Sequence, residues 1–204
     1  MLLARKAMLN DRSSALSLLQ TRRSGRPRDM VEPGPDADQI REMVKIASRT
    51  PDHGKLAPWR FVHVPKGKRP AFAELLHRAF RIDHPEPTKA ELEAVDRLAF
   101  QAPTLIAAIS SPQPSAKIPV WEQELSCGAA CMNLLHAAHA LGFVGGWITG
   151  WAVYSEEVRR ALARDGERIA GFIFIGSPGH ALEERPRPAL DYVLSEWKPP
   201  AAGA

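Results

Sequence analysis

The chain has 204 residues, of which 45% are hydrophobic and 25% are charged. That composition is typical of one globular domain, long enough to bury roughly 70% of the surface that the unfolded chain exposes. Two cysteines are too few for a disulfide framework. A formal net charge of +4 suits an anionic ligand such as a phosphate-bearing cofactor, and it is also compatible with weak nucleic-acid binding.

The two ends of the chain differ from its middle. We expect residues 1–12 to form a flexible N-terminal extension, because this stretch is too short and too interrupted for a signal peptide. We expect residues 13–204 to form a single domain. Its proline-rich tail, about 177–204, carries an apolar patch around Tyr192 and Trp197, so we expect the tail to pack on a neighbour.

Hydrophobic periodicity predicts a mixture of helices and strands. Helices are expected over 14–22, from 36 to just before 51, and over 68–82, 88–101, 119–141 and 155–163. Strands are expected over 59–64, 105–109, 144–149 and 169–175. Asp36 with Gln39, and Thr88 with Glu91, have the spacing of capping boxes. This order of elements argues for an α+β fold.

The stretch 119–141 is apolar nearly all round, which predicts a central helix that ends at Gly142. Cys127 and Cys131 lie four residues apart on it, so we interpret them as core residues in a reducing compartment, the cytoplasm. The polar His136 and His139 favour a buried helix over a membrane span, and they lack the carboxylate pattern of a zinc site.

Three segments could bind a ligand. Arg22, Arg23, Ser24 and Arg26 offer guanidinium and hydroxyl donors that match phosphate oxygens, although a solvated basic turn has the same composition. The loop 49–61 presents Arg49 and His53 beside helix-stopping prolines, which also fits a simple capping loop.

The third segment, 142–150, places four glycines around Trp147. Such a stretch leaves room for a flat ring against the main chain, and a tight β-bulge is the alternative. Its glycine spacing is not that of a dinucleotide-binding fingerprint. Glu122 and Glu124 favour the positive end of the central helix, and their spacing of two residues points them to different faces.

Five motifs in order carry a family resemblance. They are Arg22-Arg23-Ser24, the Pro-Asp-His…Pro-Trp loop, Trp-Glu-Gln-Glu at 121–124, Gly-Gly-Trp at 145–147 and the run Gly-Phe-Ile-Phe-Ile-Gly-Ser-Pro at 171–178. In this order the chain resembles the nitroreductase-like FMN flavoproteins, specifically the compact bacterial NAD(P)H nitroreductases, over about residues 13–180. The resemblance implies a mostly antiparallel central sheet flanked by helices, in an intertwined homodimer with FMN at the subunit interface.

The resemblance also implies roles for particular residues. Those expected to contact FMN are Arg22, Arg23, Ser24, Arg26, Arg49, His53, Trp147, Ile148 and Thr149, with Arg49 and His53 reaching the flavin of the other subunit. Those expected to contact NAD(P)H are Ala137, Ala138, His139, Ala140, Leu141 and Gly142. Arg185 and Arg187 could add a phosphate contact. Close relatives have Arg-Ser where Ile148-Thr149 stand, so a cation is missing here.

The expected activity is an FMN-dependent oxidoreductase that passes hydride from NAD(P)H to an electron-poor acceptor such as a nitroaromatic or quinone, with no metal and no protein nucleophile. One alternative is a flavin-binding protein of the same fold without reductase turnover, either a sensor or a flavin-consuming lyase. A nucleic-acid-binding module is the other, and it lacks a DNA-binding motif. The expected partners are a second copy of the chain and a small-molecule acceptor, with neither nucleic acid nor membrane.

Overall fold

The computed structural model describes residues 8–114 and 117–199. The strands in these residues are β1 (Met30–Val31), β2 (Trp59–Val64), β3 (Thr104–Ser110), β4 (Val144–Ile148) and β5 (Arg168–Pro178). The helices are α1 (Ala15–Thr21), α2 (Ala37–Ala47), α3 (Arg69–Asp83), α4 (Lys89–Phe100), α5 (Val120–Ala140), α6 (Trp151–Tyr154), α7 (Glu156–Leu162) and α8 (Leu190–Val193). Short 3₁₀ turns lie at Pro27–Asp29, His53–Lys55 and Lys66–Lys68.

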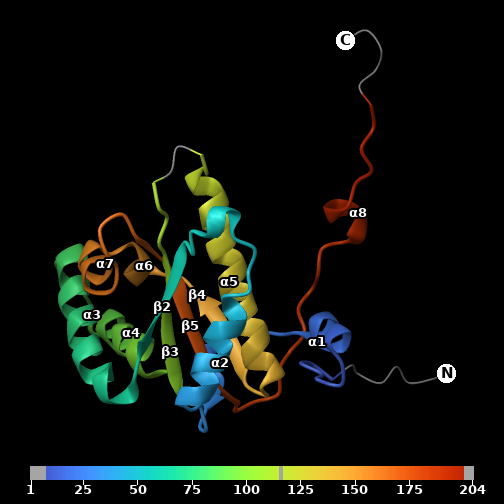
Figure 1. The fold of residues 1–204 in the computed structure, drawn as a ribbon. Helices are drawn as coiled ribbons and strands as arrows, with labels where there is room; N and C mark the ends of the chain where they lie inside the picture. Colours follow the sequence, from blue (N-terminus) through green and yellow to red (C-terminus); the bar gives the residue numbers. More distant parts are fainter. Residues whose placement is uncertain (1–7, 115–116, 200–204) are drawn as a thin grey trace.

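The strands form one antiparallel sheet with β5 at its centre (Figure 1). β5 pairs with β3 along one edge, from Thr104 opposite Ile175 to Ser110 opposite Arg168. Its opposite edge pairs with β4 over residues 172–176, and residues 177–178 pair with β1. β2 completes the sheet by pairing with β3. A long central strand therefore connects every other part of the sheet.

Helices cover both faces of the sheet: α3 and α4 lie on one side with α6 and α7, and α2 and α5 lie on the other (Figure 1). All residues of β3 are buried, and its side chains alternate between the two layers. Leu105 and Ala107 face the α3–α4 layer, whereas Ile106 and Ala108 face the α2–α5 layer. The predicted α+β fold with a helix-flanked antiparallel sheet is confirmed.

Most predicted elements form at the expected positions, with both capping boxes present at α2 and α4. Ser155 is a partial exception. It precedes α7 as predicted, but its side chain makes no capping hydrogen bond, and its buried hydroxyl has no partner among the described residues. The strand β1 and the short helices α6 and α8 are additional to the prediction.

The two ends of the described chain behave differently. Residues next to α1 are tied to the domain, because the side-chain amide of Asn10 donates to the carbonyl of Arg23 at 3.1 Å, and the Arg23 N–H donates back to Asn10 at 2.7 Å. The tail beyond β5 first contacts the residues after α1, through Glu183 and Arg187, and then runs away from the sheet and its helices at α8 (Figure 1). Tyr192 and Trp197 are 86% and 79% exposed there. Of the predicted extension over residues 1–12, residues 1–7 lie outside the described residues.

Cys127 and Cys131 are buried free thiols inside α5, as predicted. The hydrogen bond with Cys127 raises the pKa of the Cys131 thiol, and burial raises it further. Of the helices that the structure describes, none combines the length and the apolar composition needed to cross a bilayer.

Candidate functional site

The basic segment, residues 22–26 directly after α1, is held against the sheet by a backbone contact. The helix ends when Arg22 adopts extended backbone angles, and Gly25 N–H then donates to the carbonyl of Gly145 in β4 at 3.2 Å. Arg22 Nη1 donates to Ser24 Oγ at 3.2 Å. The guanidinium of Arg22 and the hydroxyl of Ser24 therefore lie together at the start of β4, as the sequence predicts for a phosphate site.

His139 fixes the strand on which this segment rests. It is fully buried in α5, and its Nε2 accepts a hydrogen bond of 3.2 Å from Gly145 N–H. Burial, followed by the nearby charge of Arg22, lowers the pKa of His139 to about 4, so the imidazole is neutral at physiological pH. Its role in this structure is to connect α5 to β4 beneath the basic segment.

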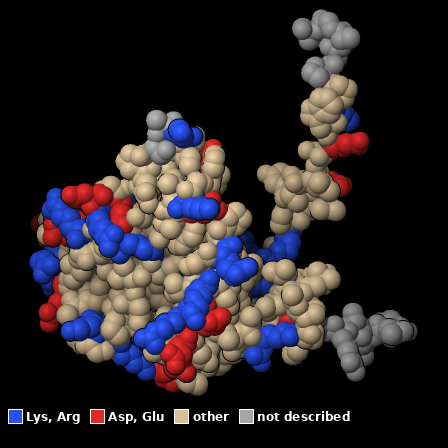
Figure 2. Space-filling view, in the orientation of Figure 1, with Lys and Arg blue, Asp and Glu red and all other residues tan. Residues whose placement is uncertain are grey.

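Arginines from the tail lie beside the basic segment. Arg187 Nη2 donates to the carbonyl of Arg22 at 3.5 Å and pairs with Glu184 at 2.9 Å. Burial lowers the pKa of Arg22, and the charges of Arg187, Arg23 and Arg185 lower it further. Several cations held this close repel one another, so an anion bound among them would be strongly favoured. Elsewhere on the face shown in Figure 2, Lys and Arg side chains lie beside Asp and Glu.

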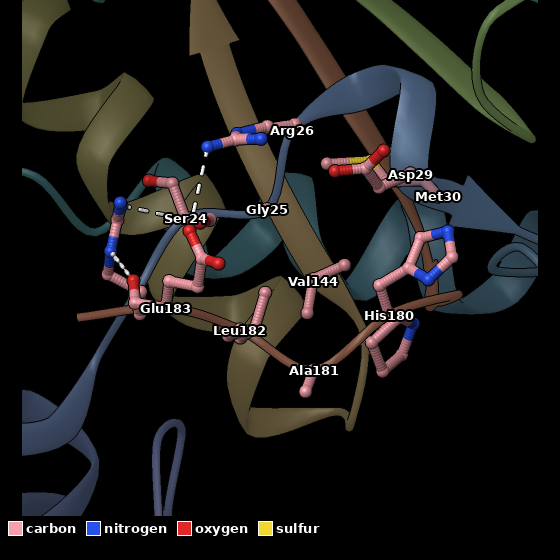
Figure 3. A pocket seen from close by; sticks show the side chains of 12 residues that line it. Ser24, Gly25, Arg26, Asp29, Met30, Val144, His180, Ala181, Leu182 and Glu183 are labelled. Atoms are coloured by element: carbon pink, nitrogen blue, oxygen red, sulfur yellow. Dashed lines mark hydrogen bonds and ion pairs between the residues drawn. The ribbon is translucent and has the colours of Figure 1, made fainter.

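A cavity of about 300 Å³ opens between the basic segment and the tail (Figure 3). Ser24 and Arg26 line one side, and His180 and Leu182 approach from the tail. Arg23 Nε donates to the carbonyl of Glu183 at 2.7 Å, and Arg26 lies 3.7 Å from the Glu183 carboxylate. The tail thus supplies one wall of the cavity, which no sequence pattern had indicated.

The second predicted segment, the loop after α2, is fastened to α5. Three side chains of α5 hold it, through the hydrogen bonds Asn133–Thr50 at 2.7 Å, Ser126–Pro51 carbonyl at 2.7 Å and Glu122–His53 at 2.7 Å. Gly54 has a φ of +78°, and a Cβ there would stand 2.3 Å from Ile118, so the loop requires glycine at this point. Arg49 and His53 are exposed.

Glu122, expected from the sequence at the positive end of the helix dipole, is a functional candidate because of its contact in the structure. Its carboxylate meets His53 Nδ1, which fixes the orientation of the exposed imidazole. The sequence signal for it was its place in the Trp-Glu-Gln-Glu motif, because the contact joins residues that lie 69 positions apart in the chain.

The third predicted segment divides between the two faces of the sheet. The Trp147 side chain is 38% exposed, lies near Gly128 of α5, and donates from Nε1 to the carbonyl of Ala170 at 3.1 Å. Ile148 points to the opposite face, where it packs against the α3–α4 layer. Ile148 and Thr149 line a separate cavity of about 260 Å³.

A single chain therefore does not gather all the predicted FMN contacts into one cavity. Arg23, Ser24 and Arg26 line the 300 Å³ cavity, and Ile148 and Thr149 line the 260 Å³ cavity. The expected convergence of the three segments stays a prediction for an assembly of two chains.

Half of the predicted NAD(P)H segment is inaccessible. Ala137, Ala138 and His139 are at most 1% exposed and face the core, so their side chains have no surface to offer a soluble ligand. Ala140 and Gly142 are exposed where α5 turns into β4. The apolar, charge-free pattern of this stretch reflects core packing.

Within the described residues, no group of three or more His, Cys, Asp or Glu side chains is arranged to hold a metal ion. The chemistry of the described donors is instead that of anion binding, with guanidinium groups, a hydroxyl and main-chain amides.

Comparison with known proteins agrees with this reading. The model of the nitroreductase family matches residues 19–177. An Escherichia coli (strain K12) protein, YdjA, named provisionally as an NAD(P)H nitroreductase, is 34% identical over 165 residues, which cover 80% of this chain and 88% of that protein.

Two solved structures share the fold. A nitroreductase-like family protein from Bacillus cereus superposes with a TM-score of 0.77 at 19% identity, covering 92% of this chain and 97% of the other. The FMN- and NADPH-dependent nitroreductase NfnB from Sphigopyxis sp. strain HMH gives a TM-score of 0.70 at 20% identity, covering 91% and 99% of the two chains.

Proposed function

This chain belongs to the nitroreductase family, and from that premise we propose that it is an FMN-dependent oxidoreductase that uses NAD(P)H to reduce a nitroaromatic or a quinone. The observation that carries the proposal is the cluster of cations around Ser24. Arg22, with its lowered pKa, stands among other arginines and beside a hydroxyl donor, an arrangement that a phosphate group would stabilise.

The residues present fit the phosphate end of FMN. Arg22, Arg23 and Ser24 would hold the phosphate, with Arg187 close enough to add a further charge. The segment 147–149 would border the ring, where Thr149 is exposed and offers a hydroxyl. Bound FMN would supply the two-electron chemistry, accepting hydride from NAD(P)H and delivering electrons to the acceptor.

The protein's own contribution is binding and orientation. The hydrogen bonds between His139 and Gly145 and between Gly25 and Gly145 fix the basic segment relative to β4. The distance between the residues that would bind the phosphate and those that would border the ring is therefore fixed as well. Main-chain donors close to the ring would favour its electron-rich reduced form, since hydrogen bonds to developing negative charge stabilise it.

We also propose that the working unit is a homodimer. Arg49 and His53 lie in the loop after α2, which is fastened to α5, and neither lines the 300 Å³ cavity beside Ser24. We propose that a second copy of the chain brings them to FMN. The exposed apolar side chains Trp121 and Leu125 on α5, 67% and 54% exposed, offer a surface for that copy. The free thiols of α5 support a reducing compartment, which we propose is the cytoplasm.

The test begins with the purified protein. It should be yellow, release FMN on heating, and oxidise NAD(P)H when menadione or a nitroaromatic is added. Arg22→Ala should lose most of its flavin, whereas Arg78→Ala, an exposed arginine on α3, should keep it. Protein that takes up no FMN would overturn the proposal, and flavin binding without NAD(P)H oxidation would favour a sensor or a flavin-consuming lyase.

A further inference from the structure

A second cavity, of about 260 Å³, lies between α4 and the end of β4. Leu98, Ile148, Trp151 and Phe172 form its apolar wall. The ring of Trp151 is held by Phe80, with centroids 4.8 Å apart in an edge-to-face arrangement. A small cavity with a rigid apolar wall suits a flat aromatic molecule of modest size.

The polar side of this cavity consists of one charged and two neutral side chains. Arg97 lies in the last turn of α4, Gln101 is the C-cap that follows this helix, and Thr149 directly follows β4. In the part of the chain that the structure describes, no hydrogen bond or ion pair engages these three side chains. Arg97 contrasts with Arg159 on nearby α7, which pairs with Glu156 at 2.7 Å.

An unpaired guanidinium beside an apolar wall selects for a particular ligand. The apolar wall attracts a hydrophobic ring, and the guanidinium attracts a planar anion such as a carboxylate, which it binds through two parallel hydrogen bonds. Gln101 and Thr149 add neutral donors on the same side. The combination matches an aromatic carboxylate better than a neutral aromatic.

We propose that this cavity binds the electron acceptor, and that Arg97 determines specificity by favouring electron-poor aromatic molecules that carry an anionic group. The inference rests on the proposed function, because the cavity shares Ile148 and Thr149 with the segment proposed to border the flavin. Arg97 thus supplies a cation to the same cavity that the apolar side chain of Ile148 lines.

The experiment compares two probes of similar shape, 4-nitrobenzoate and the neutral 4-nitrobenzyl alcohol, with the FMN-loaded enzyme. The ratio of kcat/KM for the acid to that for the alcohol should fall about tenfold in Arg97→Gln, the loss expected for one charge-assisted contact at a partly exposed site. Arg97→Lys should keep part of the preference. The matched control is Arg81→Gln, which removes an exposed cation from α3 and should leave the ratio as in the wild type.

Binding provides a readout that is independent of turnover. Calorimetric titration with benzoate, which cannot be reduced, should show about tenfold weaker affinity for Arg97→Gln and no change for Arg81→Gln. Two outcomes are distinct. An enzyme that reduces menadione but treats the acid and the alcohol alike in every variant would overturn only the assignment of this cavity. An enzyme that turns over no acceptor would overturn the proposed function and this assignment with it.

Discussion

The indole of Trp147 lies directly over Gly171, so closely that a Cβ at Gly171 would stand 2.2 Å from Nε1 of Trp147. Gly171 has a φ of +150°, and its lack of a side chain leaves the space that the ring occupies. The indole N–H then reaches the carbonyl of Ala170 at 3.1 Å. The position of the exposed Trp147 therefore depends on a glycine in the neighbouring strand.

Gly171→Ala should displace the indole and strain the centre of the sheet. We expect the free energy of unfolding to fall by about 2–3 kcal/mol, since both the clash and the backbone conformation oppose a methyl group. Urea denaturation measures the change. Gly67→Ala is the control, because a Cβ there meets nothing within 4 Å; equal losses in both variants would contradict the account of Trp147.

The ion pair between Arg60 and Glu167 should be a large single contribution to stability. Arg60 Nε donates to Glu167 Oε1 at 2.8 Å, and Ser111 and the Arg164 N–H donate to the same buried carboxylate at 2.7 and 2.6 Å. These contacts lower the pKa of Glu167 to about 2, with Arg60 as the largest cause. We expect Glu167→Gln to reduce the free energy of unfolding by about 3 kcal/mol.

The pH dependence of this effect has a defined sign. Because the folded-state pKa lies below the unfolded value near 4.5, the stabilisation is complete above pH 4.5 and is lost as the pH falls toward 2. The exposed pair Arg168–Glu124, at 3.7 Å, is the comparison. Glu124→Gln should change the free energy of unfolding by less than about 0.5 kcal/mol. A larger change would contradict the view that burial of the Glu167 carboxylate, and not loss of a charge alone, causes the effect of Glu167→Gln.

His139 should make the protein less stable in mild acid. Its pKa is about 4 in the folded state and about 6.5 when unfolded, so protons bind the unfolded chain preferentially between these values. Stability should decline as the pH falls from 6.5 to 4.5, a window above the titration of Glu167. His139→Gln retains an acceptor for Gly145 and cannot be protonated, so its unfolding free energy should show a shallower slope. His180→Gln, at an exposed position, should keep the wild-type slope.

Mixed dimers should reveal whether the flavin site is shared between subunits. We propose that Arg22 binds FMN in its own subunit and that Arg49 does so in the other. A dimer of one Arg22→Ala chain and one Arg49→Ala chain then has one intact site and one doubly altered site. We expect each homodimeric variant to lose its flavin and the mixed dimer to retain FMN at one site, measured after separation by two affinity tags. A mixed dimer without flavin would place both residues in the same subunit's site.

Much of the fold could be predicted from local patterns. The strand β2 and the helix α5 form almost where the alternation and the apolar run place them, and Asp36 caps α2 through its own side chain and through Gln39. The strand β1 could not be predicted, because it consists of Met30 and Val31 and exists only through pairing with residues 177–178 of β5.

The candidate site was harder to predict for the same physical reason. The motifs identify Arg22 and Ser24, whose contact is local. They do not indicate that Trp147 and Ile148 face opposite sides of the sheet, that Glu122 holds His53, or that Arg97 shares a cavity with Thr149. Each of these relationships joins residues on different elements or follows from strand alternation within a particular sheet.

The central position of β5 also determines when the other strands can pair during synthesis of the chain. Among the described strands, β1 and β4 pair only with β5, yet both leave the ribosome before it. Until residues 168–178 emerge, β2 and β3 can pair only with each other. The remaining strand edges stay unpaired and accessible to other nascent chains. Slow translation before this point would therefore prolong exposure to aggregation, and chaperone binding should be greatest on chains that stop just short of Arg168.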